Sequence, residues 1–358
     1  MNVYKKFLIK KFLKKIVNVS VVFLSLIVIL NIFEEISFFS NLDVNLLLPF
    51  ILTISNSPSV LFEIFPFVFL ISSLLFFLDL INSNELEVFK VNGLDNLKII
   101  TILFFTSLIT GLFLILFYYS FSSKLKFFYL ELKNNYATDG KYLAVINENG
   151  IWIKDEINGN IYIINAKKIE DEKLKEVLIV EFNLKFKANR IIISNSVDIT
   201  GTEWLISDPI ITKNNNTLIQ NGSLKLMTHF NLAKINEMFS DLSSLNIIEL
   251  NKLSNDYKRL GYSTTEVRTH LSKIYSYPIY LALMTIFSSI IMLNIKRNRP
   301  MIFYLILSIF LSVVIYYFNF LFGLLGENGK IPVYSSTIMP LFLLAVTITI
   351  GLIRINEK

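Results

Sequence analysis

Six apolar stretches, three on each side of a long polar insert, constrain the fold of this chain more than any other feature. A bilayer with a hydrocarbon core of roughly 30 Å is crossed by a helix of about 20 consecutive apolar residues. The six stretches cover approximately residues 16–33, 61–81, 99–121, 277–295, 301–321 and 333–353. The sequence therefore predicts six transmembrane helices, arranged three and three, with a polar domain between the third and the fourth.

The composition agrees with this interpretation. Hydrophobic residues make up 53% of the chain, more than is usual in soluble proteins, and charged residues only 17%, which is fewer. The chain has no Cys, which excludes disulfides and thiolate metal sites, and its two His, His229 and His270, argue against a histidine metal site. We therefore expect neither a metal nor a cofactor to be bound by the chain itself.

Lysine placement predicts the orientation, because the cytoplasmic flanks of membrane helices collect Lys and Arg. Residues 41–58, which follow the first stretch, include no Lys or Arg and are expected to form an outside loop. Basic residues instead flank the N-terminus, two later loops and the C-terminal tail: Lys5, Lys6, Lys10, Lys11, Lys14, Lys15, Lys90, Lys98, Lys296, Arg297, Arg299, Arg354 and Lys358. Both termini are thus predicted to be cytoplasmic and the insert extracytoplasmic. The net charge of +6 follows from this bias and does not indicate nucleic-acid binding.

A cleavable signal peptide is the alternative interpretation of the N-terminus. The apolar run, however, continues through Asn31 to Glu34 and Glu35 without a small-residue cleavage site. We expect a retained first helix.

The insert changes to the pattern of β-structure. Short runs rich in β-branched and aromatic residues are separated by turn residues such as Asn158-Gly159-Asn160, and they cover residues 142–146, 151–154, 161–164, 177–182, 190–194 and 204–206. This pattern is typical of a sandwich or jellyroll. Because side chains alternate along a strand, we expect one face to carry Ile151, Ile153, Ile161 and Ile163. Periodicity alone does not distinguish an ordinary β domain from a lipid-handling one.

These patterns divide the chain into three parts. Residues 1–123 contain the first three membrane helices, with a cytoplasmic loop over residues 82–98. Residues 124–245 form the all-β domain, and residues 246–358 contain an extracytoplasmic helix and the last three membrane helices.

Sequence patterns of common catalytic sites are absent. The chain has no G-x-x-x-x-G-K-[ST] phosphate loop, no G-x-S-x-G elbow and no H-E-x-x-H pair, so we assign no catalytic residues. Glu63 and Asp79 lie near the two ends of the second stretch. Ion-coupled transporters need carboxylates inside the membrane. Their scarcity favours transport driven from outside the membrane, or no transport.

The loop after the second stretch predicts a short amphipathic helix along the cytoplasmic membrane face. Leu86, Phe89 and Lys90 are expected on one side of this helix, where the Lys stem can pack beside the apolar pair. Such a helix can dock into a groove of a soluble partner, and the alternative is a helix that merely connects two spans. The candidate contact residues are Glu85, Leu86, Glu87, Phe89, Lys90 and Gly93.

At the outer end of the fourth stretch, Arg268, His270 and Lys273 are cationic or titratable candidates for ligand binding. Ordinary solvation of a helix end explains them equally well.

Several segments together resemble one known family. Residues 84–93 are similar to a loop of the form S-E-L-x-x-x-x-x-x-G, with Asn84 in place of Ser, and Gly150-Ile151-Trp152-Ile153-Lys154-Asp155 is similar to G-x-W-x-[KR]-D at the start of a jellyroll. Residues 257–278 and 326–340 resemble the family's segments before its fourth and last spans. With three spans, a periplasmic β-jellyroll and three further spans, the chain resembles the permease subunits of the lipopolysaccharide export ABC transporter, the LptF/LptG family, and is closer to LptG.

The resemblance implies a multi-pass subunit of the inner membrane of a Gram-negative cell envelope. It implies pairing with a second homologous permease over a dimer of cytoplasmic ABC ATPases, which use ATP and Mg²⁺. The pair would extract lipopolysaccharide from the membrane and pass it to a periplasmic bridge component. The loop over residues 82–98 would couple the ATPase to an apolar cavity, which the Phe- and Leu-rich first and fifth spans could line.

One departure from the family concerns the residues that would meet the lipid. Some family members have a basic residue near the outer end of the first span, where this chain has Asn31, Glu34 and Glu35. The candidate substrate contacts are Asn31, Glu34, Arg268, Lys273, Ile151, Ile153, Ile161 and Ile163. Two alternatives stay open: a permease for another amphiphile such as a lipoprotein, for which four spans would be the expected layout, and a membrane-anchored periplasmic binding or assembly protein without a transport role.

Overall fold

The computed structural model comprises two compact units. It describes residues 3–40, 45, 47–134, 136, 151–157, 159–170, 172–183, 187–213, 216–219, 222–232, 235, 241–260, 262–294 and 301–356. The membrane unit contains Met1–Lys126 and Thr264–Lys358, and the β unit contains Phe127–Ser263. Each unit has its own core, and each is described separately.

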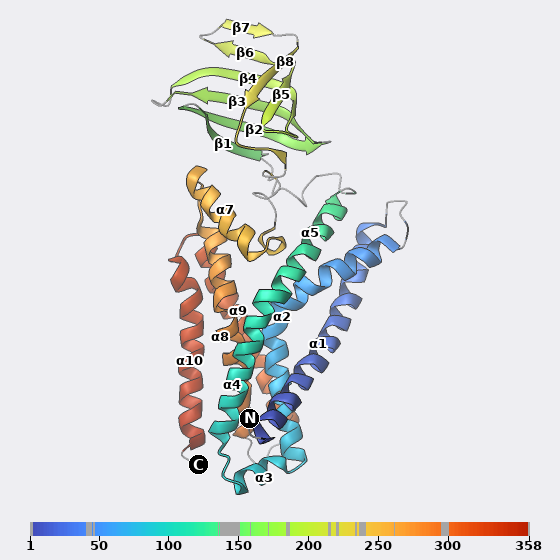
Figure 1. The fold of residues 1–358 in the computed structure, drawn as a ribbon, viewed down its shortest axis with the longest axis vertical. Helices are drawn as coiled ribbons and strands as arrows, with labels where there is room; N and C mark the ends of the chain where they lie inside the picture. The colour runs from blue at the N-terminus through green and yellow to red at the C-terminus, as the bar shows by residue number, and fades with distance from the viewer. Residues whose placement is uncertain are drawn as a thin grey trace. The chain divides into compact units, whose positions relative to one another are not determined.

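Among the described residues, six helical segments are long and apolar enough to cross a membrane, as predicted. They are longer than the predicted stretches, because each helix continues beyond its stretch at one or both ends. The bounds are α1 Val3–Phe38, α2 Leu47–Asn82, α4 Asn96–Phe113 continued by the π-helical turn η1 Leu114–Tyr119 and by α5 Ser120–Asn134, α8 Thr265–Leu293, α9 Met301–Glu327 and α10 Val333–Asn356 (Figure 1). A short helix, α3 Glu85–Val91, follows α2.

Part of the predicted outside loop is helical. Residues 47–58 belong to α2, which includes both Pro58 and Pro66. A proline leaves the carbonyl four residues earlier without its helical donor, and for Pro66 this is the carbonyl of Phe62. The Tyr277 hydroxyl of α8 donates a hydrogen bond to that carbonyl. The neighbouring helix thus compensates for Pro66 inside the predicted span.

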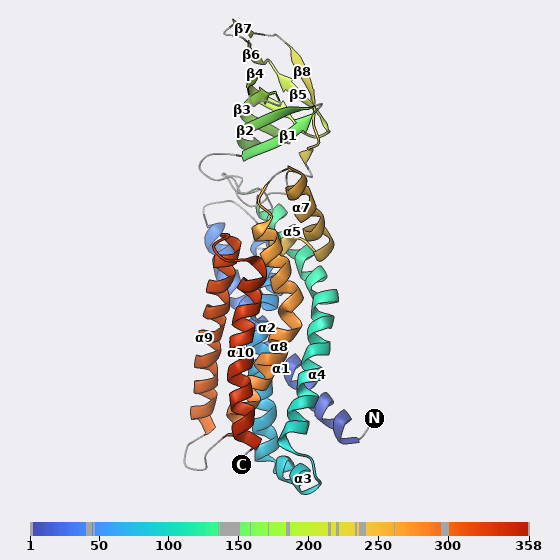
Figure 2. The same cartoon turned by 90° about the vertical axis from the view of Figure 1, so that its left-hand side faces the viewer.

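Helices α2, α4 and α8 form the core of the membrane unit. The Ser73 hydroxyl of α2 lies 3.1 Å from the Thr285 carbonyl oxygen of α8, and the Ser107 and Thr285 hydroxyls lie 2.8 Å apart. Gly111 brings α4 close to α8, because a Cβ there would lie 2.8 Å from Pro278 Cα. Small and hydroxyl residues at helix contacts are typical of membrane packing. Helices α9 and α10 lie side by side against α8 (Figure 2).

The β unit is one curled antiparallel sheet. Its strands are β1 Ile151–Ile157, β2 Asn160–Glu170, β3 Lys173–Phe182, β4 Ala188–Asp198, β5 Glu203–Ser207, β6 Ile210–Lys213, β7 Asn216–Ile219 and β8 Ser223–Met227. The order is β1-β2-β3-β4-β5-β8, and β6 pairs with both β4 and β7. Figure 2 shows β1 to β4 on one side of the curl and β5 and β8 on the other. The short helical turn η2 Leu242–Ser244 and helix α7 Ile247–Leu260 follow the sheet.

The predicted fold class, six membrane helices with an inserted all-β unit, is confirmed. Five of the predicted runs are strands, with Gly159 at a φ of 78° in the turn between β1 and β2. The run predicted at residues 142–146, like the basic residues 296–299, lies outside the described residues. Strands β6, β7 and β8 were not predicted, since they are only four or five residues long.

The prediction that four isoleucines share one face is wrong. Ile153 pairs with Ile164, whereas Ile161 pairs with Glu156 and Ile163 with Lys154. Residues directly opposite each other on antiparallel strands point to the same face. Ile151 and Ile153 therefore point to one face of the sheet, and Ile161 and Ile163 to the other. The register is fixed by the two-residue turn at Gly159, which periodicity within each run does not reveal.

The face that carries Ile151 and Ile153 is the inner one. Both side chains are 1% exposed, and the inner face of the curl continues across the neighbouring strands through Ile164, Ile179, Ile192, Trp204 and Ile206, all nearly fully buried. The Trp204 indole N–H donates to the Phe230 carbonyl oxygen at 2.8 Å. The chain after β8 thus closes one side of this apolar interior.

A buried carboxylate joins the two ends of the strand order. Asp155 of β1 accepts hydrogen bonds from the Thr228 hydroxyl at 2.7 Å, from the His229 backbone N–H at 3.0 Å and from His229 Nδ1 at 2.8 Å. Thr228 and His229 directly follow β8. Because a buried charge is tolerated only when it is paired, these bonds both satisfy Asp155 and hold the end of β8 beside β1.

Tyr262 protects the free edge of β1. Its hydroxyl accepts a hydrogen bond from the Lys154 N–H at 2.7 Å and donates to the Trp152 carbonyl oxygen at 3.3 Å. Burial raises the pKa of Tyr262 above its usual value, so the hydroxyl stays protonated and able to donate. Edge strands with unpaired backbone groups invite pairing with other chains, and this contact occupies two of those groups.

We expect Asp155→Ala to lower the free energy of unfolding of the β unit by about 3 kcal/mol, because buried donors lose their acceptor. Both Trp of the chain, Trp152 and Trp204, lie in this unit, so tryptophan fluorescence during urea unfolding of the full chain reports on it. Glu170→Gln, which breaks an exposed ion pair with Lys168, is the matched control and should change this energy by less than about 1 kcal/mol. Equal unfolding midpoints for the two variants would contradict the assignment.

Candidate functional site

Helix α3 ends in a defined C-terminal cap. Gly93 has a φ of 78°, a left-handed conformation that favours glycine, and follows the C-cap residue Asn92. The Gly93 N–H bonds to the Lys90 carbonyl oxygen and the Leu94 N–H to the Phe89 carbonyl oxygen, both at 3.0 Å. This pair of bonds is a Schellman motif. The predicted helix and its terminal Gly are therefore confirmed.

The faces of α3 differ from the expected grouping. Leu86 is buried, and the Phe89 ring lies 6.2 Å from the Phe7 ring of α1. Lys90 is exposed, as is Glu87. Val88 is 57% and Val91 88% exposed. The outward face of α3 thus combines apolar and charged side chains, which is the character of a face that meets a partner protein.

Two ion pairs connect α1 with the region of α3. Lys11 Nζ lies 2.5 Å from Glu85 Oε2, and Lys15 Nζ lies 2.6 Å from Asp79 Oδ2 in the last turn of α2. A cavity of about 790 Å³ lies between the first turns of α1 and α3, with Tyr4, Phe7, Val88, Phe89 and Lys98 among its lining residues. Sequence reasoning missed these pairs because Lys11 and Glu85 are far apart in the chain.

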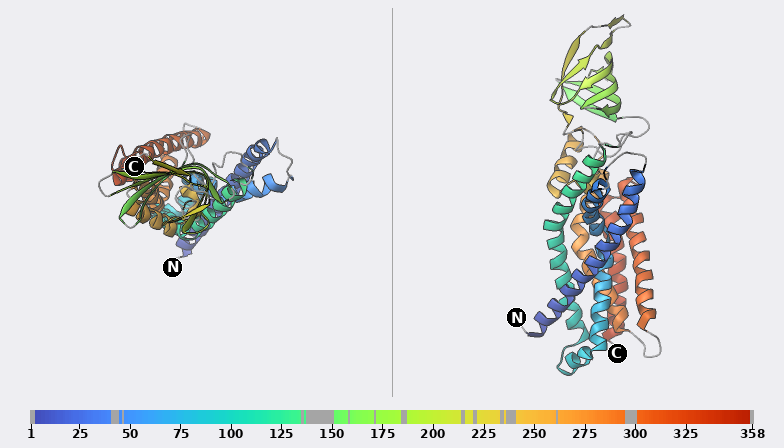
Figure 3. Two further views of the ribbon diagram at one scale, coloured as in Figure 1. Left: turned by 90° about the horizontal axis from the view of Figure 1, so that it is seen from above. Right: turned by 90° about the vertical axis from the view of Figure 1, so that its right-hand side faces the viewer.

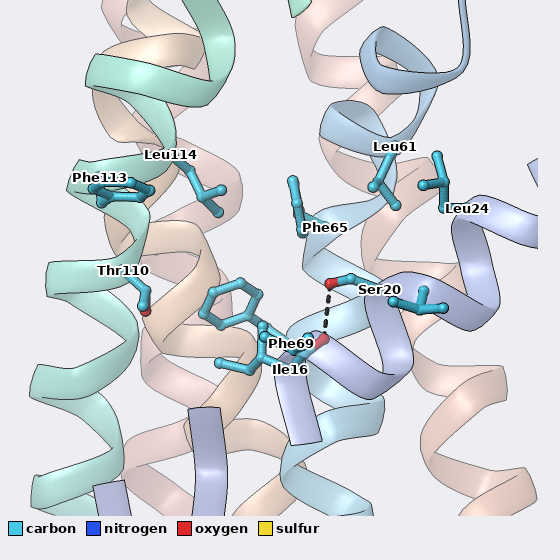
Figure 4. A pocket seen from close by; sticks show the side chains of 11 residues that line it. Ile16, Ser20, Leu24, Leu61, Phe65, Phe69, Thr110, Phe113 and Leu114 are labelled. Carbon is cyan, nitrogen blue, oxygen red and sulfur yellow. Dashed lines mark hydrogen bonds between the residues drawn. The ribbon is translucent and has the colours of Figure 1, made fainter. Parts of the chain in front are cut away.

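A second cavity, of about 250 Å³, lies within the membrane-spanning part and is apolar (Figure 4). Two hydroxyls border it, but the Ser20 hydroxyl donates to the Ile16 carbonyl oxygen and the Thr110 hydroxyl to that of Thr106 within their own helices. Both hydroxyls are therefore hydrogen-bonded to their own helices and not to a group in the cavity. The lining residues are Ile16, Val17, Ser20, Val21, Leu24, Leu61, Phe65, Phe69, Thr110, Phe113 and Leu114.

This cavity, which we call the apolar pocket, is lined by the first, second and third spans. The expectation of a cavity between the first and fifth spans is not met by this pocket, because α9 contributes no lining residue. The pocket adjoins the π-helical turn η1, which begins at Leu114. Such turns within α-helices often occur at functional sites.

The candidate cations in the N-terminal part of α8 have different surroundings. Lys273 Nζ lies 2.6 Å from Glu327 Oε1, and Gly323 makes room for the Lys273 side chain, because a Cβ there would lie 2.5 Å from it. Arg268 is exposed. His270 Nε2 lies 3.2 Å from the Tyr119 hydroxyl. The positive charge of Lys273 is therefore already balanced within the protein.

The remaining candidate contacts lie on α1 and in the β unit. Asn31 is half-buried and Glu34 exposed on α1. Contact of lipid with the four isoleucines stays a prediction. Because of the strand register, lipid on one face of the sheet would meet Ile151 and Ile153, and lipid on the other face would meet Ile161 and Ile163. Among the described residues, no cluster of three or more His, Asp or Glu side chains could hold a metal ion.

Comparison with protein families decides the assignment. The sequence model of the family described as lipopolysaccharide export system permease LptF/LptG matches residues 6–354. The chain belongs to this family. The match covers all six spans and the β unit, and it does not distinguish an LptF from an LptG subunit. A comparison with curated proteins found no match. The chain is thus a multi-pass inner-membrane permease component of lipopolysaccharide export.

For this LptF/LptG permease, the structure separates two cations that the sequence treated alike. We expect Arg268→Ala to reduce crosslinking of lipopolysaccharide at the N-terminal part of α8 about fivefold, since an exposed charge is available to phosphate. Lys273→Ala should reduce it less than twofold, because its charge already pairs with Glu327. Crosslinking in native membranes, at low and high salt, is the measurement, and a larger loss for Lys273→Ala would contradict this ranking.

Proposed function

We propose that this permease extracts lipopolysaccharide from the outer leaflet of the inner membrane and passes it to a periplasmic bridge component. In this proposal the chain pairs with a second homologous permease, and a dimer of cytoplasmic ABC ATPases drives the cycle. Both termini and α3 face the cytoplasm, and the β unit faces the periplasm. ATP and Mg²⁺ bind to the ATPases and not to this chain.

One observation supports the proposal above all others: the membrane unit combines the apolar pocket with a short helix, α3, whose outward face carries exposed apolar and charged side chains. An acyl chain that moves from the bilayer into an apolar pocket gains or loses little hydrophobic free energy, because both surroundings are equally apolar. Binding in the pocket can therefore be reversible. Width and shape of the pocket, rather than its polarity, would then govern entry.

Energy is required at the next step. Exposing an acyl chain to water costs about 0.8 kcal/mol per CH₂ group, so a lipid with several chains does not leave the bilayer spontaneously. Among the described residues, carboxylates that could serve as ion sites are scarce in the middle of the spans. An energy source outside the membrane, acting through α3, agrees with both facts. The β unit offers an apolar interior of its own.

We expect a photo-crosslinker at Leu114, which lines the apolar pocket, to capture lipopolysaccharide during ATP turnover and less without ATP. A crosslinker at Ile109, which is 64% exposed on the same helix, is the matched control and should capture bulk phospholipid regardless of ATP. The readout is mass spectrometry of the adducts. Capture of lipoprotein instead would favour a different amphiphile, and equal adducts at both positions would exclude the pocket as the route.

The outward face of α3 predicts where the ATPase docks. Val91→Asp and Glu87→Lys should each reduce copurification of the ATPase about tenfold, because each places an unfavourable charge in a docking face. Lys10→Gln, at an exposed position of α1, is the control and should leave it unchanged. If no ATPase copurifies with the wild-type chain, the protein acts instead as a membrane-anchored binding or assembly factor.

A further inference from the structure

One aromatic contact and two ion pairs of α1 follow one another along the helix. Phe7, Lys11 and Lys15 are four residues apart and therefore lie along one side of α1. Phe7 contacts Phe89, Lys11 pairs with Glu85, and Lys15 pairs with Asp79. We call the first two contacts, which join α1 to α3, the α1–α3 clasp; the third joins α1 to α2.

The contacts of the clasp support one another. Lys11 Nζ lies 5.5 Å from the centroid of the Phe7 ring while it pairs with Glu85, so the same ammonium group joins the aromatic and ionic parts. The Lys11 and Lys15 side chains are only 21% and 24% exposed. Partial burial reduces screening by solvent and salt relative to a surface pair.

The same helix reaches the apolar pocket immediately beyond the clasp. Ile16 and Val17 follow Lys15 directly, and Ser20, Val21 and Leu24 continue the lining over the next two turns. Helix α1 crosses α2 obliquely (Figure 3). Most of its outer half faces away from the unit, with Val22, Ile29 and Leu30 more than half exposed. Helix α1 packs mainly against α2. A helix with one main neighbour can pivot on that neighbour with little loss of core packing elsewhere.

We propose that the α1–α3 clasp makes α1 the element that transmits a displacement of α3 to the apolar pocket. When the ATPase moves α3, Glu85 carries Lys11 with it, whereas Asp79 of α2 holds Lys15 in place. Helix α1 then pivots about Lys15 and changes the width of the pocket through Val17 and Leu24. This inference rests on the proposed function. It assigns Glu85 and Lys11 as positioning residues, in contrast to a direct contact of Glu85 with the ATPase.

A reciprocal charge exchange tests the clasp. The variants are Lys11→Glu, Glu85→Lys and the double exchange, with Lys11→Arg as the conservative form and Lys14→Glu, at an exposed position of α1, as control. The full chain is assembled with its partner permease and ATPase in proteoliposomes that contain lipopolysaccharide. Copurified ATPase, ATP hydrolysis and lipopolysaccharide released per ATP are measured separately.

Each single reversal should lower lipopolysaccharide release per ATP about tenfold, because it places like charges together. Copurification and ATP hydrolysis should stay within about twofold of the wild type, since the docking face is unchanged. The double exchange and Lys11→Arg should restore release to at least half the wild-type value, and Lys14→Glu should not alter it. If a charge reversal prevents accumulation of the protein, Lys11→Gln and Glu85→Gln take its place with the same expected order of effects.

Pocket width supplies the second readout. The chain has no Cys, so a pair introduced by Leu24→Cys and Leu114→Cys is unique. Its rate of disulfide crosslinking should depend on ATP in the wild-type background and lose that dependence in Lys11→Glu and Glu85→Lys.

Two results overturn the proposal. If Glu85→Lys abolishes copurification while Lys11→Glu has no effect and the exchange does not rescue it, Glu85 contacts the ATPase directly. If crosslinking keeps its ATP dependence in both single variants, α1 is moved by another route. Failure of the proposed function itself is distinct, because the wild-type chain would then neither retain an ATPase nor release lipopolysaccharide.

Discussion

The membrane unit depends on one constraint: inside a bilayer no water is available to satisfy a backbone carbonyl. The carbonyl of Phe62, which Pro66 deprives of its helical donor, is satisfied by the Tyr277 hydroxyl of α8. This single contact allows a proline inside α2 and fixes α2 against the core helix α8. Leu61, Phe65 and Phe69, on either side of the proline, line the apolar pocket. The apolar pocket therefore lies beside the proline and its compensating contact.

Ion pairs lie at both ends of the membrane unit. At one end Lys11 and Lys15 pair with Glu85 and Asp79, and at the other Lys273 pairs with Glu327. Between them the pocket offers only apolar side chains and hydroxyls already bonded to their own helices. The unit can therefore hold an acyl chain without a charged partner at membrane depth, and the energy for release has to enter at the ends.

In the β unit, two side chains satisfy polar groups at the edge strand of the curled sheet. A sheet with free edges exposes unpaired backbone groups, and here Asp155 and Tyr262 act at the edge strand β1. Asp155 binds the segment after β8, and the Tyr262 hydroxyl occupies the Lys154 N–H and the Trp152 carbonyl. Asp155, the last residue of the G-x-W-x-[KR]-D motif, thus has a structural role in this unit, because its carboxylate accepts hydrogen bonds from Thr228 and His229.

The sequence by itself determined the six spans, the all-β insert, the short helix at Glu85 and its termination at Gly93, because each depends on local composition, periodicity or backbone conformation. Tertiary structure alone decided that Ile161 and Ile163 point to the other face of the sheet from Ile153. It also decided the ion pairs of Lys11 with Glu85 and of Lys273 with Glu327, and the contribution of the second and third spans to the pocket. These facts follow from strand register and helix packing. They depend on residues distant in the chain, about which local patterns carry no information.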